Sequence, residues 1–178
     1  MYDIFCFIYM PNIWEKISGN PSTSLPADRH GSGDKSVNSA EKSSSGRVFI
    51  IAEIGKNFIQ TKEEKSVEEY LENAKKLVDA AAEAGADAVK FQTHNVEDEQ
   101  LNIDIVSPHF KGADRYSWVV RNTRATPVEG FWKPLKAYCD KGGIIFFSTQ
   151  MSLGAAKILN EEVGVDLWKI GSGDILDF

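Results

Sequence analysis

Polar side chains stand at the ends of short apolar runs, the position at which α/β proteins gather their ligand-binding groups. Glu53 ends the run VFIIAE, Lys90 lies in ADAVKF, Thr149 follows IIFFS, and Lys169 precedes a Gly-Ser-Gly-Asp turn. A lysine inside an apolar strand is costly unless it pairs with an acid or reaches an anion. Ammonium groups, hydroxyls and exposed backbone N–H groups together suit a phosphate or a carboxylate. The pattern predicts an anion site.

Each of these residues also has a structural interpretation. A strand lysine could extend outward to water or bridge to an acid such as Glu53, and Glu53 could be an ion-pair partner rather than an acid–base group. Gly-Ser-Gly turns are common by themselves. Ser148 and Thr149 could serve only to cap a helix that begins at Ser152. The anion site therefore depends on the elements that bring these groups together.

Strands and helices alternate from residue 48 onward. Strands are expected at 48–54, 86–91, 144–147 and 165–170, and helices are expected at 67–84, 127–142 and 153–163. Ser66 is the expected N-cap of the first helix, Gly85 its C-terminal stop, and Pro134 falls in the first turns of the second. The order βαβαβαβ implies a parallel sheet with right-handed crossovers. Parallel strands end at one edge, so the polar side chains should converge there.

Residues 96–126 are polar and aromatic without a clear period, and we expect a long loop that is functional or disordered. Its aromatic residues Phe110, Tyr116 and Trp118 suit either a lid or an oligomer contact. His94 and His109 are expected to be loop histidines rather than metal ligands, because no paired spacing supports a metal site.

Bulk composition excludes several classes of protein. The chain has 178 residues, a net charge of -6 and a pI near 5.1, which argues against a nucleic-acid partner. Its two cysteines, Cys6 and Cys139, form no disulfide or zinc pattern, and a reducing cytoplasm fits best. The apolar start MYDIFCFIYMPNIW is too short to span a bilayer and lacks signal-peptide features. With the Ser/Gly-rich linker at 18–47, residues 1–47 are expected to be a disordered extension, and 48–178 the globular part.

Four segments carry a family resemblance. They are IAEIGKN (51–57), AGADAVKFQTHNVEDE (84–99), FFSTQMS (146–152) and WKIGSGDI (168–175). With them the chain resembles the N-terminal part of the sialic acid synthase family, the phosphoenolpyruvate-dependent N-acetylneuraminate, legionaminate and pseudaminate synthases. The resemblance implies the first four strands of a TIM (β/α) barrel. It also implies a homodimeric transferase that condenses phosphoenolpyruvate with an N-acetylated aldose such as N-acetylmannosamine, assisted by a divalent metal, Mn²⁺ or Mg²⁺.

The resemblance also assigns roles by motif. The residues expected to bind phosphoenolpyruvate are Lys90, Thr149, Lys169 and Ser172. The residues expected to act near the reacting carbons are Glu53 and Asp174. Possible additional site residues are Asn57 and Gln92.

Two departures from the family pattern qualify these roles. Phe58 stands where the family usually has a histidine, which would disturb sugar or metal binding. The chain also ends after the fourth expected strand, before the family's metal ligands and C-terminal domain. We therefore expect a truncated chain that is inactive alone. The alternatives are a non-catalytic remnant that acts by association, and an independent flavodoxin-like domain that binds a phosphorylated ligand.

Overall fold

A computed structural model describes residues 7–8, 48–59, 63–103 and 114–175. In this part of the chain the sheet has the strand order β1-β5-β4-β3-β2. The strands are β1 (Phe7–Ile8), β2 (Ile51–Gly55), β3 (Ala88–Thr93), β4 (Ile145–Gln150) and β5 (Trp168–Lys169). β2, β3, β4 and β5 pair in parallel, each with its successor in the chain. The predicted α/β class is confirmed, and this sequential order is that of a (β/α) barrel rather than of a flavodoxin-like sheet.

The strands lie slightly later in the chain than predicted. β2 begins at Ile51 rather than at Val48, and Val48 and Ile50 are 76% and 52% exposed. β3 and β4 run on to Thr93 and Gln150, so Gln92 and Thr149 lie within strands and not after them. Apolar content located the strands, but pairing with the neighbouring strand determines where each one ends.

The N-terminal extension is described only at β1. Phe7 and Ile8 pair antiparallel with Lys169 and Trp168 of β5, and the prediction of a non-globular extension over residues 1–47 stays a prediction. Residues 1–6 and 9–47 lie outside the described part, as do Phe110 and His109. Among the described helices, none has the length and apolar character needed to cross a membrane.

The first long helix, α2 (Val67–Glu83), begins and ends as its sequence predicts. Ser66 Oγ accepts a hydrogen bond from the Glu69 N–H, and the Glu69 carboxylate accepts one from the Ser66 N–H. This reciprocal capping satisfies two N–H groups that the helix itself cannot. The chain leaves the helix at Gly85, whose φ of 85° suits a residue without a Cβ.

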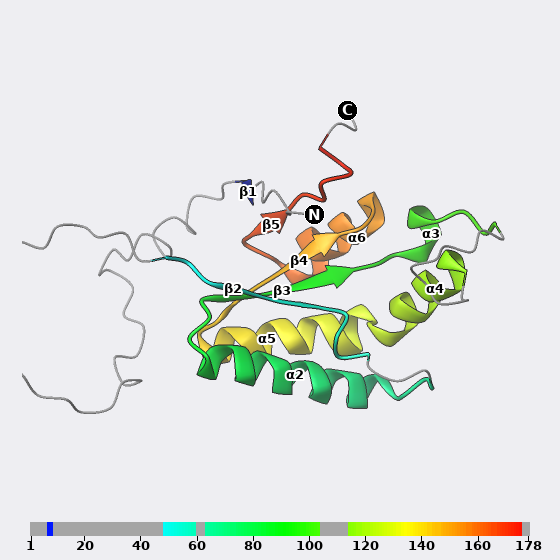
Figure 1. Cartoon of the computed structure of the whole chain (residues 1–178). Helices are drawn as coiled ribbons and strands as arrows, with labels where there is room; N and C mark the ends of the chain where they lie inside the picture. The colour runs from blue at the N-terminus through cyan, green and yellow to red at the C-terminus, as the bar shows by residue number, and fades with distance from the viewer. Residues whose placement is uncertain (1–6, 9–47, 60–62, 104–113, 176–178) are drawn as a thin grey trace, which may run out of the picture.

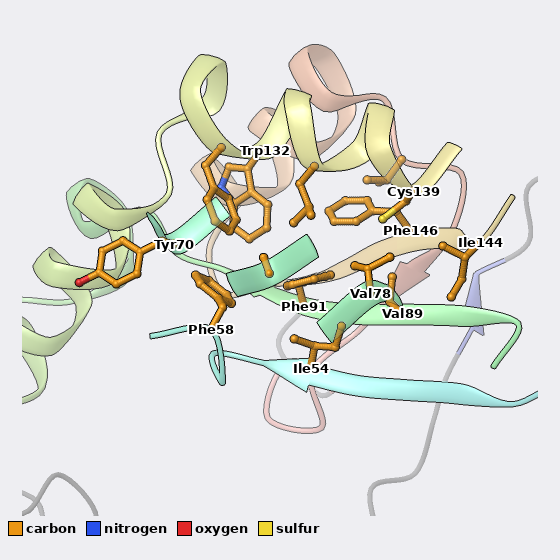
Figure 2. Close-up of a cluster of buried hydrophobic side chains, with 14 of the residues drawn as sticks. Ile54, Phe58, Tyr70, Val78, Val89, Phe91, Trp132, Cys139, Ile144 and Phe146 are labelled. Atoms are coloured by element: carbon orange, nitrogen blue, oxygen red, sulfur yellow. The ribbon is translucent and has the colours of Figure 1, made fainter. Parts of the chain in front are cut away.

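The main core lies between one face of the sheet and the helices α2 and α5 (Lys133–Gly142), which run side by side along it (Figure 1). Figure 2 shows side chains of the strands and helices meeting in this layer. Phe58 is fully buried there, and its ring centroid lies 4.9 Å from that of Phe131 and 6.0 Å from that of Phe91. Its bulk fills the core, and its ring centroid also lies 5.7 Å from the Lys56 ammonium. The expected disturbance of sugar or metal binding by Phe58 stays a prediction.

The described part of the long loop expected at 96–126 is largely helical, which corrects that prediction for these residues. It contains α3 (Val96–Glu99) and α4 (Arg115–Ala125), and residues 104–113 lie outside the described part. Asp114 starts α4 by accepting hydrogen bonds from the Ser117 N–H and Oγ. The polar surface of α4 hid its periodicity, since only Val119, Asn122 and Ala125 of this helix are buried.

The remaining helices contain wide turns. The helix predicted from Pro127 begins as a π-helical turn (η2, Val128–Trp132) before α5, and Pro134 stands in the first turn of α5 as expected. The helix predicted from Leu153 comprises α6 (Leu153–Lys157) and the π-helical η3 (Ile158–Val163). Ser152 caps α6 by accepting from the Ala155 N–H at 3.1 Å.

Candidate functional site

The sheet has a second face, opposite α2 and α5, and the predicted strand residues point to it. Ala88, Phe147 and Leu167 form a separate buried apolar cluster with partly buried Phe49, Ile51 and Ile145. Side chains two residues apart on a strand share a face. By this rule Glu53 lies on the same face of the sheet as Ile51, Lys90 as Ala88, Thr149 as Phe147 and Lys169 as Leu167. We call Glu53, Lys90, Gln92, Thr149 and Lys169 the strand-end cluster.

Lys90 is the centre of this cluster. Its side chain is 4% exposed, its ammonium pairs with the half-exposed Glu53 carboxylate, and it donates to Thr149 Oγ1 at 3.2 Å. Glu53 lies opposite Lys90 in the ladder between β2 and β3. A buried ammonium retains its charge when a carboxylate and a hydroxyl replace water. Three of the predicted residues therefore meet in one hydrogen-bonded group.

Lys169 and Gln92 lie on the same face, two residues further along their strands than the level of Lys90. The register aligns Gln92 with Thr149, and Thr149 with Lys169. Lys169 is 8% exposed, and within the described residues its ammonium has no hydrogen bond or ion pair. Gly55, with φ 54°, brings the β2 backbone against this group, because a Cβ there would lie 3.4 Å from Glu53 Oε1 and 3.9 Å from Gln92 Nε2. Gln92 is thus placed beside the Lys90–Glu53 pair.

The structure does not bring the other predicted residues into hydrogen-bonding contact with the strand-end cluster. Ser172 and Asp174 are exposed in a turn after β5, where the Asp174 N–H donates to the Gly171 carbonyl at 3.0 Å. Asp174 folds back over Gly171, since a Cβ at Gly171 would lie 2.5 Å from Asp174 Oδ2. Asn57 is exposed, and its N–H donates to the Ile54 carbonyl. The roles that the resemblance assigned to these three residues stay predictions.

The alternative that Ser148 and Thr149 merely cap a helix is wrong. Thr149 bonds Lys90, and Ser148 Oγ lies 2.7 Å from Thr93 Oγ1 across the β3–β4 pair. The N-terminus of α6 is instead held by Asp98 of α3, which accepts from Ser152 Oγ at 2.8 Å and from the Gly154 N–H at 2.5 Å. Asp98 therefore ties the segment after β3 to the segment after β4.

A further group of charged residues, absent from the sequence predictions, lies at the ends of β2 and β3. His94 was expected in a loop, but it is 3% exposed, and its Nδ1 lies 2.7 and 2.8 Å from the oxygens of the buried Glu99 carboxylate. Arg115 Nη2 approaches Glu99 at 3.6 Å. The ammonium of Lys56 is buried near this group. We call Lys56, His94, Glu99 and Arg115 the basic cluster; only the five-residue spacing of His94 and Glu99 hinted at it.

Burial sets the electrostatics of the basic cluster. Desolvation lowers the pKa of Lys56 to about 7, and the nearby Glu99 carboxylate only partly opposes this. Desolvation also lowers the pKa of His94, against the effect of its hydrogen bond to Glu99. Around neutral pH the basic cluster thus holds a neutral imidazole and a lysine that is close to half protonated.

Among the described residues, no group of three or more His, Cys, Asp and Glu side chains is arranged to hold a metal ion. The expected divalent metal stays a prediction. The strand-end cluster can instead supply fixed positive charge, a hydroxyl and an amide to an anion, with one carboxylate beside them for proton transfer.

Comparison with known proteins gives these observations a family context. A family model described as the NeuB family matches residues 77–178. The chain is 34% identical over 128 residues to the spore coat polysaccharide biosynthesis protein SpsE of Bacillus subtilis, covering 72% of this chain and 31% of SpsE. It is 30% identical over 134 residues to N-acetylneuraminate-9-phosphate synthase of Mus musculus, covering 73% of this chain and 34% of that enzyme. The chain thus spans about a third of the length of these curated relatives.

A solved structure is also similar in sequence. The crystal structure of N-acetylneuraminic acid synthetase from Leptospira borgpetersenii serovar Hardjo-bovis, in complex with citrate, is 29% identical, with a TM-score of 0.45. The match covers 66% of this chain and 34% of that one.

Proposed function

Because the chain belongs to the NeuB family, we propose that the strand-end cluster is the phosphoenolpyruvate-binding part of a sialic-acid-synthase-type site. The proposed reaction condenses phosphoenolpyruvate with an N-acetylated aldose such as N-acetylmannosamine, and yields a nonulosonic acid and phosphate. Its relatives include a protein named as an N-acetylneuraminate-9-phosphate synthase.

Lys169 is the observation that carries this proposal. The Lys169 residue is 8% exposed, and its ammonium makes no hydrogen bond or ion pair with a described residue, so that ammonium is available to an anion. It stands level with Thr149 and Gln92, and Thr149 bonds Lys90. Phosphoenolpyruvate carries two anionic groups, and two lysines on one face offer one cation for each.

Each residue of the strand-end cluster then has a separate task. Lys90 and Thr149 form a preorganised pair, so little rearrangement is needed when they bind an oxyanion. The half-exposed Glu53 can accept or return a proton at the reacting carbons while it remains beside Lys90. We propose that Ser172 and Asp174 approach from their turn, with Asn57 and Gln92 as additional contacts.

The finer assignments remain part of the proposal. These are the aldose, the Mn²⁺ or Mg²⁺ ion, the homodimer and the cytoplasmic location. We further propose that the 178-residue chain binds phosphoenolpyruvate but does not turn it over.

Phosphoenolpyruvate binding tests the site directly. Isothermal titration calorimetry on the purified chain should detect binding, and Lys169→Met should weaken it about 10- to 100-fold through the loss of a charge-assisted contact. The exposed helix residue Lys76 supplies the control, and Lys76→Met should bind as the wild type does. Equal affinity of Lys169→Met and wild type would overturn the proposal.

Turnover is measured separately as phosphate release from phosphoenolpyruvate with N-acetylmannosamine and Mn²⁺. Binding without release is the expected result. Sustained release by the 178-residue chain would contradict the prediction of inactivity but would support the reaction itself.

A further inference from the structure

The basic cluster has no task in the proposed reaction, yet it contains an unusual set of polar atoms. Within the described residues, Lys56 Nζ, His94 Nε2 and Arg115 Nε are each buried without a hydrogen-bond partner. Buried polar atoms of a folded protein nearly always have one. Three such nitrogens on residues that are grouped near the Glu99 carboxylate indicate a ligand or ordered solvent at this place.

Glu99 cannot satisfy the other members by itself. Its two oxygens lie 2.8 and 2.7 Å from His94 Nδ1, and Arg115 Nη2 approaches one of them at 3.6 Å. Lys56 makes no hydrogen bond to it, and the Lys56 ammonium lies 5.7 Å from the centroid of Phe58 and 5.8 Å from that of Trp132. Ring faces offset only part of the cost of burying an ammonium. The remaining cost falls when an anion binds.

The hydrogen-bonding roles of the three nitrogens narrow the chemistry of that anion. A carboxylate only accepts, so His94 Nδ1 carries the proton that is shared with Glu99, and the neutral ring leaves Nε2 as an acceptor. Lys56 Nζ and Arg115 Nε can only donate. Two donors and one acceptor fit an oxyanion that also carries a hydroxyl group.

The cluster is also reachable from solvent. The Arg115 side chain is 42% exposed while the Glu99 side chain is 2% exposed, so Arg115 leads from the surface to the buried carboxylate. The edge of Trp118 meets the His94 ring at 5.0 Å between centroids and fixes the imidazole in place. Glu99 of α3 and His94 after β3 are titratable groups near Lys56, and Arg115 of α4 lies near His94 and Glu99.

We propose that Lys56, His94 and Arg115 form a second binding site, apart from the strand-end cluster, for a small oxyanion that bears a hydroxyl group. Lys56 and Arg115 donate to the anionic oxygens, and His94 Nε2 accepts from the hydroxyl. Hydroxycarboxylates and hydrogen phosphate share this chemistry.

The test uses the 178-residue chain carrying Lys169→Met, so that the strand-end cluster does not contribute to anion binding. Glycolate and acetate differ only by a hydroxyl, and neither titrates near neutral pH. By calorimetry at pH 7, glycolate should bind about tenfold more tightly than acetate, which leaves His94 Nε2 unpaired. Glycolate affinity should fall about tenfold for each pH unit above 7, because Lys56 loses its proton there.

Two further variants locate the site. Adding Lys56→Met should abolish glycolate binding, and Arg115→Gln, at a partly exposed side chain, should weaken it about tenfold. Adding Lys76→Met should change nothing. Inorganic phosphate is measured in the same way at pH 7, and the probe that binds more tightly, glycolate or phosphate, identifies the ligand source. The proposal is overturned if neither probe binds, if glycolate binds no better than acetate, or if Arg115→Gln binds glycolate unchanged.

Discussion

The strand-end cluster and the basic cluster both contain residues from β2 and β3 or from the segments directly after them. They differ in how a lysine is stabilised in each. Lys90 pairs with Glu53 and donates to Thr149. Lys56 lies beside aromatic rings without a hydrogen-bond partner, while the nearby Glu99 is occupied by His94. A carboxylate partner offsets the loss of water around a buried ammonium, and a ring face offsets only part of it.

The two clusters therefore contain two kinds of lysine: one that is already paired and holds the site in shape, and one that would be stabilised by a bound anion. Lys90 is already satisfied, so it can hold an oxyanion site in shape without substrate. The Lys56 ammonium is buried without a hydrogen-bond partner, and Lys169 makes no hydrogen bond or ion pair with a described residue, so these two lysines would gain most from an anion. Substitutions that remove one charge at a time can test this contrast.

The largest effect is expected for Lys56→Met, and it should stabilise the fold. The pKa of Lys56 is lowered from 10.5 to about 7, so between these values the unfolded chain binds more protons and stability rises with pH. Below pH 7 the full cost of the buried charge is present. The variant should therefore gain roughly a few kcal/mol at pH 6 and progressively less towards pH 10. Urea denaturation at both pH values measures it, and a loss of stability at pH 6 would contradict the unpaired state of Lys56.

The next largest effect is expected for Gly154→Ala, which would disturb the contact between α3 and α6. A Cβ at Gly154 would overlap the side chains of Asn95 and Asp98, and Asp98 holds the N-terminus of α6. Overpacking of this kind costs about 1–3 kcal/mol. Gly142→Ala in α5 is the matched control, because a Cβ there meets nothing within 4 Å. Thermal unfolding should show a loss only for Gly154→Ala.

A smaller effect of opposite sign to that of Lys56→Met is expected for Lys90→Met. The substitution removes the partner of Glu53, but the Glu53 side chain is 49% exposed and water can solvate it. A loss of about 1 kcal/mol follows from the broken pair and the lost bond to Thr149. Denaturation at pH 7 measures the change, and stabilisation by this variant would remove the distinction between the two lysines.

The smallest effect is expected for Lys76→Met on the exposed side of α2. An exposed lysine without a structural partner contributes within about 0.5 kcal/mol. A larger change in the same denaturation experiment would show that general charge balance, rather than local pairing, governs the lysine series.

Local features of the fold were predictable from the sequence. The caps at Ser66 and Ser152, the stop at Gly85 and the position of Pro134 were all found as expected. The helix α4 was missed because most of its surface is polar, and its few buried residues do not form a clear period. The meeting of Glu53, Lys90 and Thr149 was anticipated because parallel strands end at one edge.

What the sequence by itself determined is the alternation of strands and helices and the polar residues at the strand ends, since both depend on neighbours a few positions apart. Only the tertiary structure decided that Lys56 is buried between Phe58 and Trp132, and that His94 is held by Glu99 against Trp118. The free-energy cost of burying a charged group depends on the partners around it, and those partners come from distant parts of the chain. The sequence therefore predicted the strand-end cluster, while the basic cluster became visible only in three dimensions.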